Sequence, residues 1–328
     1  MDELLELAQQ MKDALESQDE EALGRIVLAY SRIYGNISPL VDALLVQMEG
    51  QSNIERLTEY RALMEMIERE IERFEEYLIV EMQTAIEQDA QTGGTNALLL
   101  IATALSVGLG ISMSQAQQFV QERTPSDIMM EMLIDGSPLY ERIQMLSGAV
   151  SEYVRSVLIE SMALGRNPRT TARLIQSAFG RGLTDALRMA RTAQLYAWRK
   201  ASLEEYQANA DILSGWVWFA TLDDTVCQSC IAMHGTIHPL DELLNDHHNG
   251  RCAMLPLVKG VDSPVGLTGI EWFESLPESR QMEILGKGKY EAWKDGRFTF
   301  AQLSKERNDE VYGTMRVETP LKELVSDE

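Results

Sequence analysis

The sequence predicts a mainly α-helical protein, in which helical N-terminal and central regions are followed by a small α+β module and a short helical tail. The chain has 328 residues, only 9 prolines and 7% aromatic residues, and its many Leu, Ala, Met, Glu and Gln residues favour helix. All three cysteines and all four histidines fall within residues 227–252, beside a β-branched and aromatic stretch that favours strand. We therefore expect four segments, namely 1–124, 125–210, 211–262 and 263–328.

The first segment, 1–124, is expected to begin with two helical stretches. Ser38 and Pro39 predict a break between them, because Ser38 can cap a new helix and proline suits the first helical position. Apolar residues at helical spacing then predict a long helix over about 54–87. Its charged faces leave two interpretations open, an ordinary bundle helix or a surface for self-association or subunit contact.

The stretch 90–121 contains no charged residue. Its apolar centre, 97–113, is about 17 residues long, whereas a helix that spans a bilayer needs about 20. Gly108 and Gly110 also interrupt it. A buried core helix that ends at these glycines is the preferred interpretation, and a segment that meets a membrane is the alternative. We expect no stable membrane insertion.

In the second segment a short helix is predicted to begin at Ser126 and Asp127, and three helices are predicted after it, over 138–163, 168–178 and 184–209. Proline opens the first two of these three, and Gly180 and Gly182 are expected to separate the last two.

Charge is distributed unevenly along the chain, whose formal net charge is −22. Residues 1–150 hold 26 acids and 9 bases, whereas residues 151–200 hold 3 acids and 9 bases. A general nucleic-acid coating protein is excluded, because its whole surface would have to be basic. The basic segment predicts a local surface for DNA phosphates or an acidic partner, with a solvated helix face as the alternative. Its candidate residues are Arg166, Arg169, Arg173, Arg188 and Arg191.

The third segment, 211–262, is expected to be a small α+β module. Strands are predicted over 216–221, 235–237 and 252–256, with a helical turn over 239–244. A module of this size has little core of its own, so a metal ion would help it to hold its shape. The tail is expected to contain short helices separated by glycines.

Cysteine spacing predicts the metal. Cys227 and Cys230 have the spacing of a metal knuckle, and histidines and Cys252 follow about twenty residues later. This pattern suits a structural zinc held by the three cysteines and one histidine. A metal-free fold in which these residues pack and hydrogen-bond is the alternative. Three clustered cysteines and no secretion signal also indicate assembly in a reducing compartment.

The same stretch carries a family resemblance. Trp218, Thr221–Cys230, Gly235, His247–Cys252 and Pro256 resemble the pattern of the phage Mu F-like head morphogenesis (minor head) proteins. The resemblance covers roughly 125–328. It indicates His247 as the histidine ligand, so that the expected zinc set is Cys227, Cys230, His247 and Cys252; His248 and His234 are the alternatives for the fourth ligand.

The chain departs from the family pattern at three positions. His248 stands where the family usually has proline, Gly250 where it has the first of two cysteines, and Ala193 where it has glutamate. The chain therefore lacks one thiol of the family pattern. The role that the glutamate has in relatives is not performed by residue 193 in this chain.

The resemblance implies a minor structural protein of a tailed bacteriophage head. Such a protein would associate with the portal protein or the major capsid protein and assist head assembly, DNA packaging or DNA ejection. It would be located in the virion head or portal vertex, and in the host cytoplasm during assembly. We expect no enzymatic activity. The alternative is an HNH-like metal-dependent nuclease, although the chain has no second CxxC after Cys252.

Overall fold

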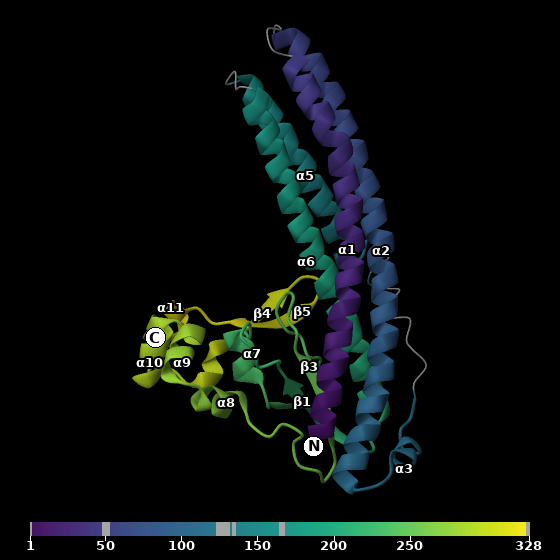
Figure 1. Cartoon of the computed structure of the whole chain (residues 1–328), viewed down its shortest axis with the longest axis vertical. Coiled ribbons are helices and arrows are strands. Elements are labelled where there is room, and N and C mark those ends of the chain that lie inside the picture. Colours follow the sequence, from purple (N-terminus) through teal and green to yellow (C-terminus); the bar gives the residue numbers. More distant parts are fainter. Residues whose placement is uncertain (1, 48–52, 123–131, 133–135, 164–167, 326–328) are drawn as a thin grey trace. The chain divides into compact units, whose positions relative to one another are not determined.

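The structure is a computed structural model that describes residues 2–47, 53–122, 132, 136–163 and 168–325 (Figure 1). By their packing, these residues form two compact units. Unit 1 comprises Met1–Ser17, Ile86–Ser126 and Gln194–Glu328, and unit 2 comprises Gln18–Ala85 and Asp127–Ala193. Each unit therefore combines segments that are far apart in the sequence.

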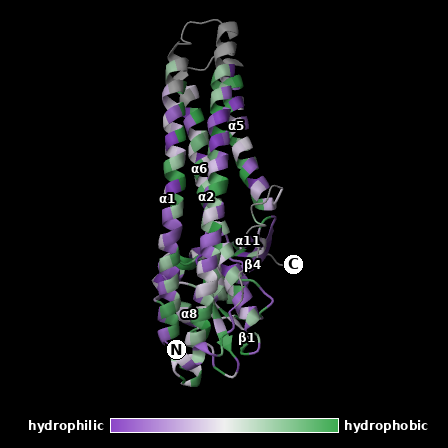
Figure 2. Cartoon of the chain, turned by 90° about the vertical axis from the view of Figure 1, so that its right-hand side faces the viewer, coloured by the Kyte–Doolittle hydropathy of each residue, from purple (hydrophilic) through white to green (hydrophobic). Residues whose placement is uncertain are grey.

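The described residues are mainly helical, which confirms the predicted fold class. Four long helices account for most of them, and hydrophobic and hydrophilic residues alternate along their length (Figure 2). These helices are α1 (Asp2–Gln47), α2 (Asn53–Leu109), α5 (Pro138–Ala163) and α6 (Pro168–Ala208). A short helix, α3 (Met113–Gln117), begins at Ser112, whose hydroxyl caps it. The short helix predicted to begin at Ser126 and Asp127 lies outside the described residues.

Helix α1 has no break at Pro39, so this prediction was wrong. The helix runs from Asp2 to Gln47 with Pro39 inside it. An internal proline costs about 3 kcal/mol because it removes a backbone hydrogen bond and crowds the preceding turn. Ile37 and Val41, on either side, are 1% and 2% exposed, and burying two such side chains contributes about 1.5–3 kcal/mol each. Packing therefore outweighs the local preference for a break.

Helix α6 likewise continues through the two glycines that were predicted to end it. It runs without interruption from Pro168 to Ala208. A Cβ atom at Gly182 would lie 2.8 Å from Val150 Cγ2 and 3.1 Å from Tyr30 Oη. Gly182 thus allows neighbouring helices to approach closely and does not terminate α6.

Unit 2 is a helical bundle with an aromatic centre. The Tyr30 ring packs edge-on against Phe74, with ring centroids 4.7 Å apart, and against Phe179 at 6.2 Å. The Tyr30 hydroxyl donates a hydrogen bond to the backbone carbonyl of Phe179. Burial of this hydroxyl raises the pKa of Tyr30, so the donor stays protonated in the pH range in which proteins are stable.

Unit 1 contains a three-stranded antiparallel sheet in the order β2-β1-β3. The central strand, β1 (Leu213–Phe219), pairs with β2 (Ile237–His238) and with β3 (Ala253–Val258). A short helix, α7 (Gln228–Met233), lies between β1 and β2 in the sequence. Residues 239–244 form a turn rather than a helix.

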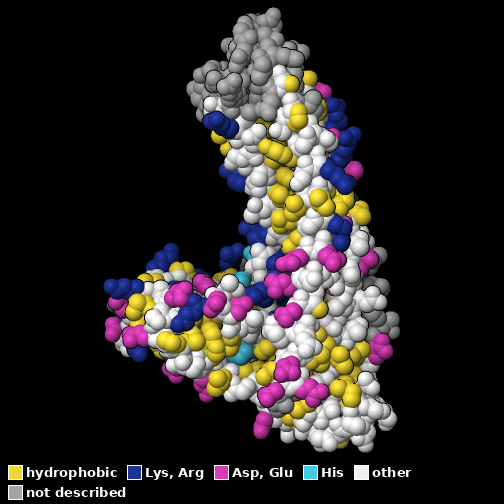
Figure 3. Space-filling view, in the orientation of Figure 1, with side chains coloured by type: hydrophobic (Ala, Val, Ile, Leu, Met, Phe, Trp, Pro, Cys, Tyr) yellow, Lys and Arg dark blue, Asp and Glu magenta, His cyan; other side chains and the backbone are white. Residues whose placement is uncertain are grey.

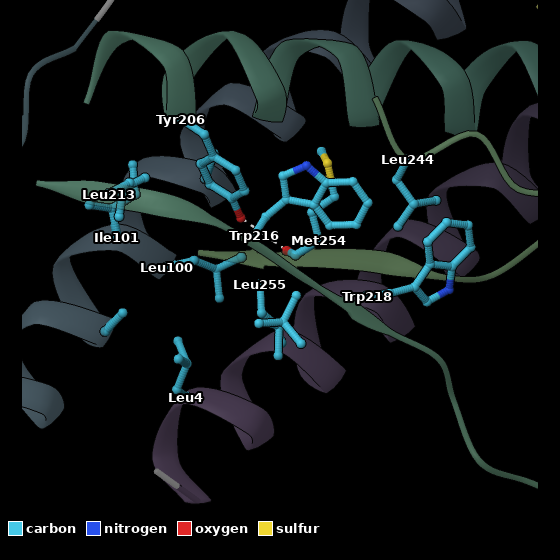
Figure 4. Packing of buried hydrophobic residues seen from close by; sticks show 14 of the residues in the cluster. Leu4, Leu100, Ile101, Tyr206, Leu213, Trp216, Trp218, Leu244, Met254 and Leu255 are labelled. Carbon is cyan, nitrogen blue, oxygen red and sulfur yellow. Dashed lines mark hydrogen bonds between the residues drawn. The ribbon is translucent and has the colours of Figure 1, made fainter. Parts of the chain in front are cut away.

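The core of unit 1 forms around β1. Trp216 and Trp218 are at most 1% exposed and lie 6.0 Å apart between ring centroids, and Tyr206 of α6 donates a hydrogen bond to the Met254 carbonyl at 2.9 Å (Figure 4). Side chains from distant parts of the sequence complete this cluster; they include Leu4, Ala8 and Met11 of α1, Leu100, Ile101 and Leu105 of α2, and Leu244 and Leu255. The sheet is thereby covered by segments that precede it by more than a hundred residues.

The charge-free stretch lies in this core, as expected. It forms the C-terminal part of α2, which ends at Leu109, and Gly110 follows with a φ of 64° that favours glycine. By length and composition alone, Arg61–Leu109 could cross a membrane, and 44% of its most apolar stretch is buried.

The tail contains the predicted short helices and, in addition, an unpredicted hairpin. The helices are α8 (Gly269–Ser275), α9 (Glu278–Leu285), α10 (Lys287–Lys294) and α11 (Leu321–Leu324), with a 3₁₀ helix over Phe300–Leu303. Strands β4 (Ser304–Asp309) and β5 (Gly313–Glu318) pair antiparallel. Strand β4 is rich in charged residues and has a poor intrinsic preference for strand, which is why the sequence did not reveal it.

Candidate metal centre

The first part of the centre is the cysteine knuckle at the start of α7. Cys227 caps this helix, and its sulfur accepts a hydrogen bond from the Cys230 backbone N–H at 3.1 Å. The cap turns both thiols to the same side, so that their sulfur atoms lie 2.8 Å apart. Cys230 is buried, whereas Cys227 is partly exposed.

His247 faces the two thiols. Its Nε2 atom lies 3.0 Å from Cys227 Sγ and 3.4 Å from Cys230 Sγ. Its Nδ1 atom lies 2.9 Å from the His248 carbonyl oxygen. A carbonyl can only accept, so Nδ1 carries a proton, and Nε2 faces the sulfurs. This orientation suits a metal-binding imidazole.

Cys252 and Asp246 lie on the other side of Cys230. Two groups of donors have all their ligand atoms within 4.8 Å of one another: Cys227, Cys230 and His247 form the first, and Cys230, Asp246 and Cys252 form the second. Cys230 belongs to both. The four residues predicted as ligands are thus gathered around one buried sulfur, together with a carboxylate that the sequence analysis did not include.

Arg199 of α6 holds the loop that carries Cys252. The guanidinium is 4% exposed and donates hydrogen bonds to the Cys252 carbonyl at 3.0 and 2.9 Å and to the Gly250 carbonyl at 2.6 Å. Its Nη2 atom also lies 3.8 Å from Asp246 Oδ2. This buried cation links the long helix to the centre and offsets part of its negative charge.

The remaining histidines point elsewhere. The Nδ1 atom of His234 accepts a hydrogen bond from the Ala220 N–H at 3.0 Å. His238 stacks on Trp216 with ring centroids 4.3 Å apart. His248 Nε2 lies 3.4 Å from an Asp309 carboxylate oxygen. Of the three candidates for the histidine ligand, only His247 shares a donor group with the thiols in the described part of the chain.

The thiols differ in their acid–base properties. A hydrogen bond from the Cys230 thiol stabilises the Cys227 thiolate and lowers the pKa of Cys227 to about 6. The pKa of Cys230 is raised because its proton is held in that bond and because the residue is buried. Burial by itself would lower the pKa of His247, but the Cys227 sulfur and the Asp246 carboxylate raise it to about 10. A positive charge is therefore favoured between these donors.

The residues present fit a zinc ion. Thiolate sulfur and imidazole nitrogen are the donors that zinc prefers in structural sites. A cavity of about 110 Å³ opens beside them, so an ion could reach the donors; it is lined by Ala220, Thr221, Thr225, Val226, Cys227, Cys230, His247, Asn249, Arg251 and Cys252. Zinc bound here would supply a fixed cross-link between α7 and the 246–252 loop.

A second buried cation lies nearby. Lys12 of α1 is 8% exposed. Its ammonium group donates a hydrogen bond to Thr221 Oγ1 and lies 4.8 Å from the centroid of the Phe219 ring. Burial lowers the pKa of Lys12 to about 8. The sequence analysis missed both Lys12 and Arg199, because each comes from a helix distant in sequence.

The candidate residues of the predicted basic surface differ in exposure and in partners, and side chains of both charge signs occur on the face shown in Figure 3. Arg188 is exposed and pairs with Asp185 at 2.8 Å. Arg173 is exposed and Arg191 is half-buried. Arg166 and the side chain of Arg169 lie outside the described residues. The proposed contact with DNA or an acidic partner stays a prediction.

Comparison with known proteins gives one match. Residues 152–255 match the model of the family described as phage Mu protein F like protein. No curated protein and no solved structure matches the chain. The matched segment extends from α5 through β3 and includes all the donors described above. This confirms the resemblance found in the sequence: residues 152–255 are similar to the phage Mu protein F-like family.

Proposed function

We propose that this protein is a minor structural component of a tailed bacteriophage head, which associates with the portal or procapsid and assists head assembly, DNA packaging or DNA ejection. The family match over residues 152–255 is the observation that carries the proposal. The protein would act by binding, from a position in the virion head. Its long helices would supply the contact surfaces, and the centre would fix the geometry of unit 1.

The geometry of the centre favours a structural role over the nuclease alternative. A nuclease histidine must reach a water molecule or a substrate atom. Here Nε2 of His247 faces two sulfurs, and its Nδ1 atom is engaged with a backbone carbonyl. The neighbouring His248 is directed at Asp309 and the Tyr312 ring.

Helix α2 offers a candidate contact surface for portal or capsid subunits. Glu65, Glu72 and Glu76 are exposed in unit 2 and are spaced by seven and four residues. This spacing places the three carboxylates on one face of the helix. Arg61 and Arg69 are also exposed on this face, so a partner would meet both signs of charge there and association would be sensitive to salt.

The contact can be tested by co-expression with the portal protein of the same phage, followed by gel filtration at low salt. We expect co-elution, and at least a tenfold weaker association when Glu65, Glu72 and Glu76 are changed together to Gln. A control variant that removes the exposed acids Glu274, Asp295 and Glu310 of the tail should bind normally. Equal binding by both variants would exclude the α2 face, and absence of co-elution with both portal and major capsid proteins would contradict the assembly role.

We also propose that the centre holds one structural zinc ion. Cys227, Cys230 and His247 would be three of its ligands, and Cys252 and Asp246 are the candidates for the fourth. Zinc content per chain should be measured after purification without added metal. About one zinc per chain is expected, lost in His247→Gln and retained in the matched variant His248→Gln. No zinc in the unmodified protein would refute the metal centre and leave the family assignment unaffected.

A further inference from the structure

Asp246 is a fully buried carboxylate at the centre. It is 0% exposed. It accepts a hydrogen bond from the His247 N–H at 2.8 Å and a longer one from the Cys252 N–H at 3.4 Å. Its nearest guanidinium, that of Arg199, lies 3.8 Å away and already donates to two carbonyl groups. A buried carboxylate costs several kcal/mol unless a positive charge compensates it, and the long distance to Arg199 makes this compensation incomplete.

The carboxylate oxygens lie at the separations that a shared tetrahedral ion requires. Zinc bonds of about 2.3 Å to sulfur and 2.0–2.2 Å to nitrogen or oxygen place unlike donors about 3.3–3.6 Å apart. Cys230 Sγ is 3.6 Å from Asp246 Oδ1, and His247 Nε2 is 3.5 Å from the same oxygen. The third separation, between Cys230 Sγ and His247 Nε2, is 3.4 Å. These three donor atoms therefore form one face of a tetrahedron of the right size.

Gly250 provides the room that the carboxylate occupies. A Cβ atom at this position would lie 2.1 Å from Asp246 Oδ2 and 2.3 Å from Asp246 Cγ. Any residue with a side chain at position 250 would thus displace Asp246 from the donor group. The combination of a glycine at 250 and an aspartate at 246 is what brings an oxygen donor to the centre.

We infer that Asp246 is itself a metal ligand. Together with Cys227, Cys230 and His247 it completes a set of two cysteines, one histidine and one aspartate. Cys252 remains uncoordinated. This inference rests on the proposed zinc centre and specifies its fourth ligand. Cys227 Sγ, 2.8 Å from Cys230 Sγ, moves outward to the sulfur–sulfur separation of about 3.8 Å that zinc imposes.

Electrostatics supports the same set. Two thiolates and one carboxylate around Zn²⁺ leave a net charge of −1, which the buried Arg199 balances. A third thiolate, with the carboxylate left uncoordinated, adds another negative charge in a region of low dielectric constant. Lys12, a second buried cation near Cys230 and Cys252, has its ammonium group directed at Thr221 Oγ1 and the Phe219 ring.

Zinc X-ray absorption spectroscopy on the purified full-length protein tests the assignment, because it counts sulfur and lighter ligands separately. We expect two sulfur and two nitrogen or oxygen ligands in the unmodified protein. Cys252→Ser should keep one zinc with the same count, whereas Asp246→Asn should bind zinc at least tenfold more weakly.

The assignment of Asp246 would be overturned if zinc in the unmodified protein had three sulfur ligands and one lighter ligand, and if Cys252→Ser had only two sulfur ligands. That result would leave the zinc centre itself intact. Absence of zinc from the unmodified protein would refute the centre and this ligand set together. The spectrum of the unmodified protein decides between these results even if a variant fails to fold.

Discussion

At the scale of single residues, the centre depends on pairs that are not adjacent in sequence. Asp246 needs the space that Gly250 leaves, and the 250–252 loop needs the guanidinium of Arg199 to satisfy two of its carbonyls. Arg199 satisfies buried carbonyl groups that would otherwise be costly, and Gly250 leaves room for a buried carboxylate. Substitutions that leave every donor in place can therefore still disturb the centre.

Gly250→Ala is expected to weaken zinc binding at least tenfold, because the new methyl group overlaps the Asp246 carboxylate. It should also lower the free energy of unfolding by about 1–3 kcal/mol. Competition with a chromophoric chelator and urea denaturation measure the two effects. Gly266→Ala is the matched control, since a Cβ atom there meets nothing within 4 Å; comparable losses in both variants would contradict the steric explanation.

His234 predicts a pH dependence of stability. Burial lowers the pKa of His234 from 6.5 to about 4, and the neutral ring accepts the Ala220 N–H. Between pH 6.5 and pH 4 the unfolded chain binds a proton that the folded chain does not. Stability from this group is thus complete above pH 6.5 and falls as the pH decreases towards 4, by on the order of 2–3 kcal/mol.

The variant His234→Asn isolates this effect, because its amide oxygen can accept the same N–H without titrating. Urea denaturation at pH 7 and pH 5 should show a smaller loss for the variant than for the unmodified protein. Loss of metal at low pH affects both proteins, so it cancels in the comparison. Equal slopes would mean that His234 is not the titrating group.

At the scale of elements, close backbone contact joins α2 and α6 inside unit 1. A Cβ atom at Gly93 would lie 2.3 Å from the Trp198 carbonyl oxygen and 2.9 Å from Trp198 Cα. The hydroxyl of Ser202 donates a hydrogen bond to the Gly93 carbonyl at 3.1 Å. Backbone atoms cannot yield as a flexible side chain can, so the contact fixes the separation of the two helices.

Two neighbouring glycines provide an internally controlled test of this contact. Gly93→Ala should destabilise the protein by about 2 kcal/mol or more, as overpacking against backbone does. Gly94→Ala faces only Glu205, at 3.7 Å, and should be neutral or stabilising by up to about 1 kcal/mol, because alanine favours helix. Thermal or urea unfolding of the two variants measures the difference, and equal effects at both positions would contradict the close contact at Gly93.

Elements were predictable where local signals and packing agree. The helix at Pro138–Ala163, the strand around Trp216 and the tail helices follow from periodicity, proline position and β-branched or aromatic composition. The predictions at Pro39 and Gly182 were wrong because both residues usually end helices, whereas here burial of neighbouring side chains and close helix packing prevail. The β4–β5 hairpin escaped notice because its strands are largely charged.

The centre was predictable to a similar extent. Its thiols and His247 could be located because every cysteine and histidine falls within 26 residues. Asp246 could not be singled out, since it is one of eight acids among residues 201–250. Arg199 is 53 residues from Cys252 in the sequence, and Lys12 is 209 residues from Thr221. A local sequence pattern cannot predict contacts between residues so far apart.

At the scale of the whole molecule, the metal centre lies in only one of the two units. All donors belong to unit 1. Metal removal should therefore loosen unit 1 first, because a small sheet with little core of its own gains most from a cross-link. Unit 2 is held by the aromatic contacts around Tyr30 and contains no donor of the centre.

Hydrogen–deuterium exchange with and without a zinc chelator tests this difference. We expect faster exchange in Leu213–Phe219 and Ala253–Val258 after chelation, and unchanged exchange in Pro138–Ala163. Cys230→Ser should show the faster exchange without chelator. Unchanged protection of the sheet would contradict a stabilising metal, and equal loss in both units would show that the chain unfolds as one cooperative body.

The division of unit 1 between both ends of the chain has a consequence for biosynthesis. The apolar side chains of Leu4, Ala8 and Met11 are made before the strands of the same cluster, β1 and β3, which follow more than two hundred residues later. All of unit 2 emerges in the meantime and can fold before its neighbour. Part of the hydrophobic surface at the beginning of α1 therefore stays uncovered until β1 and β3 have been made.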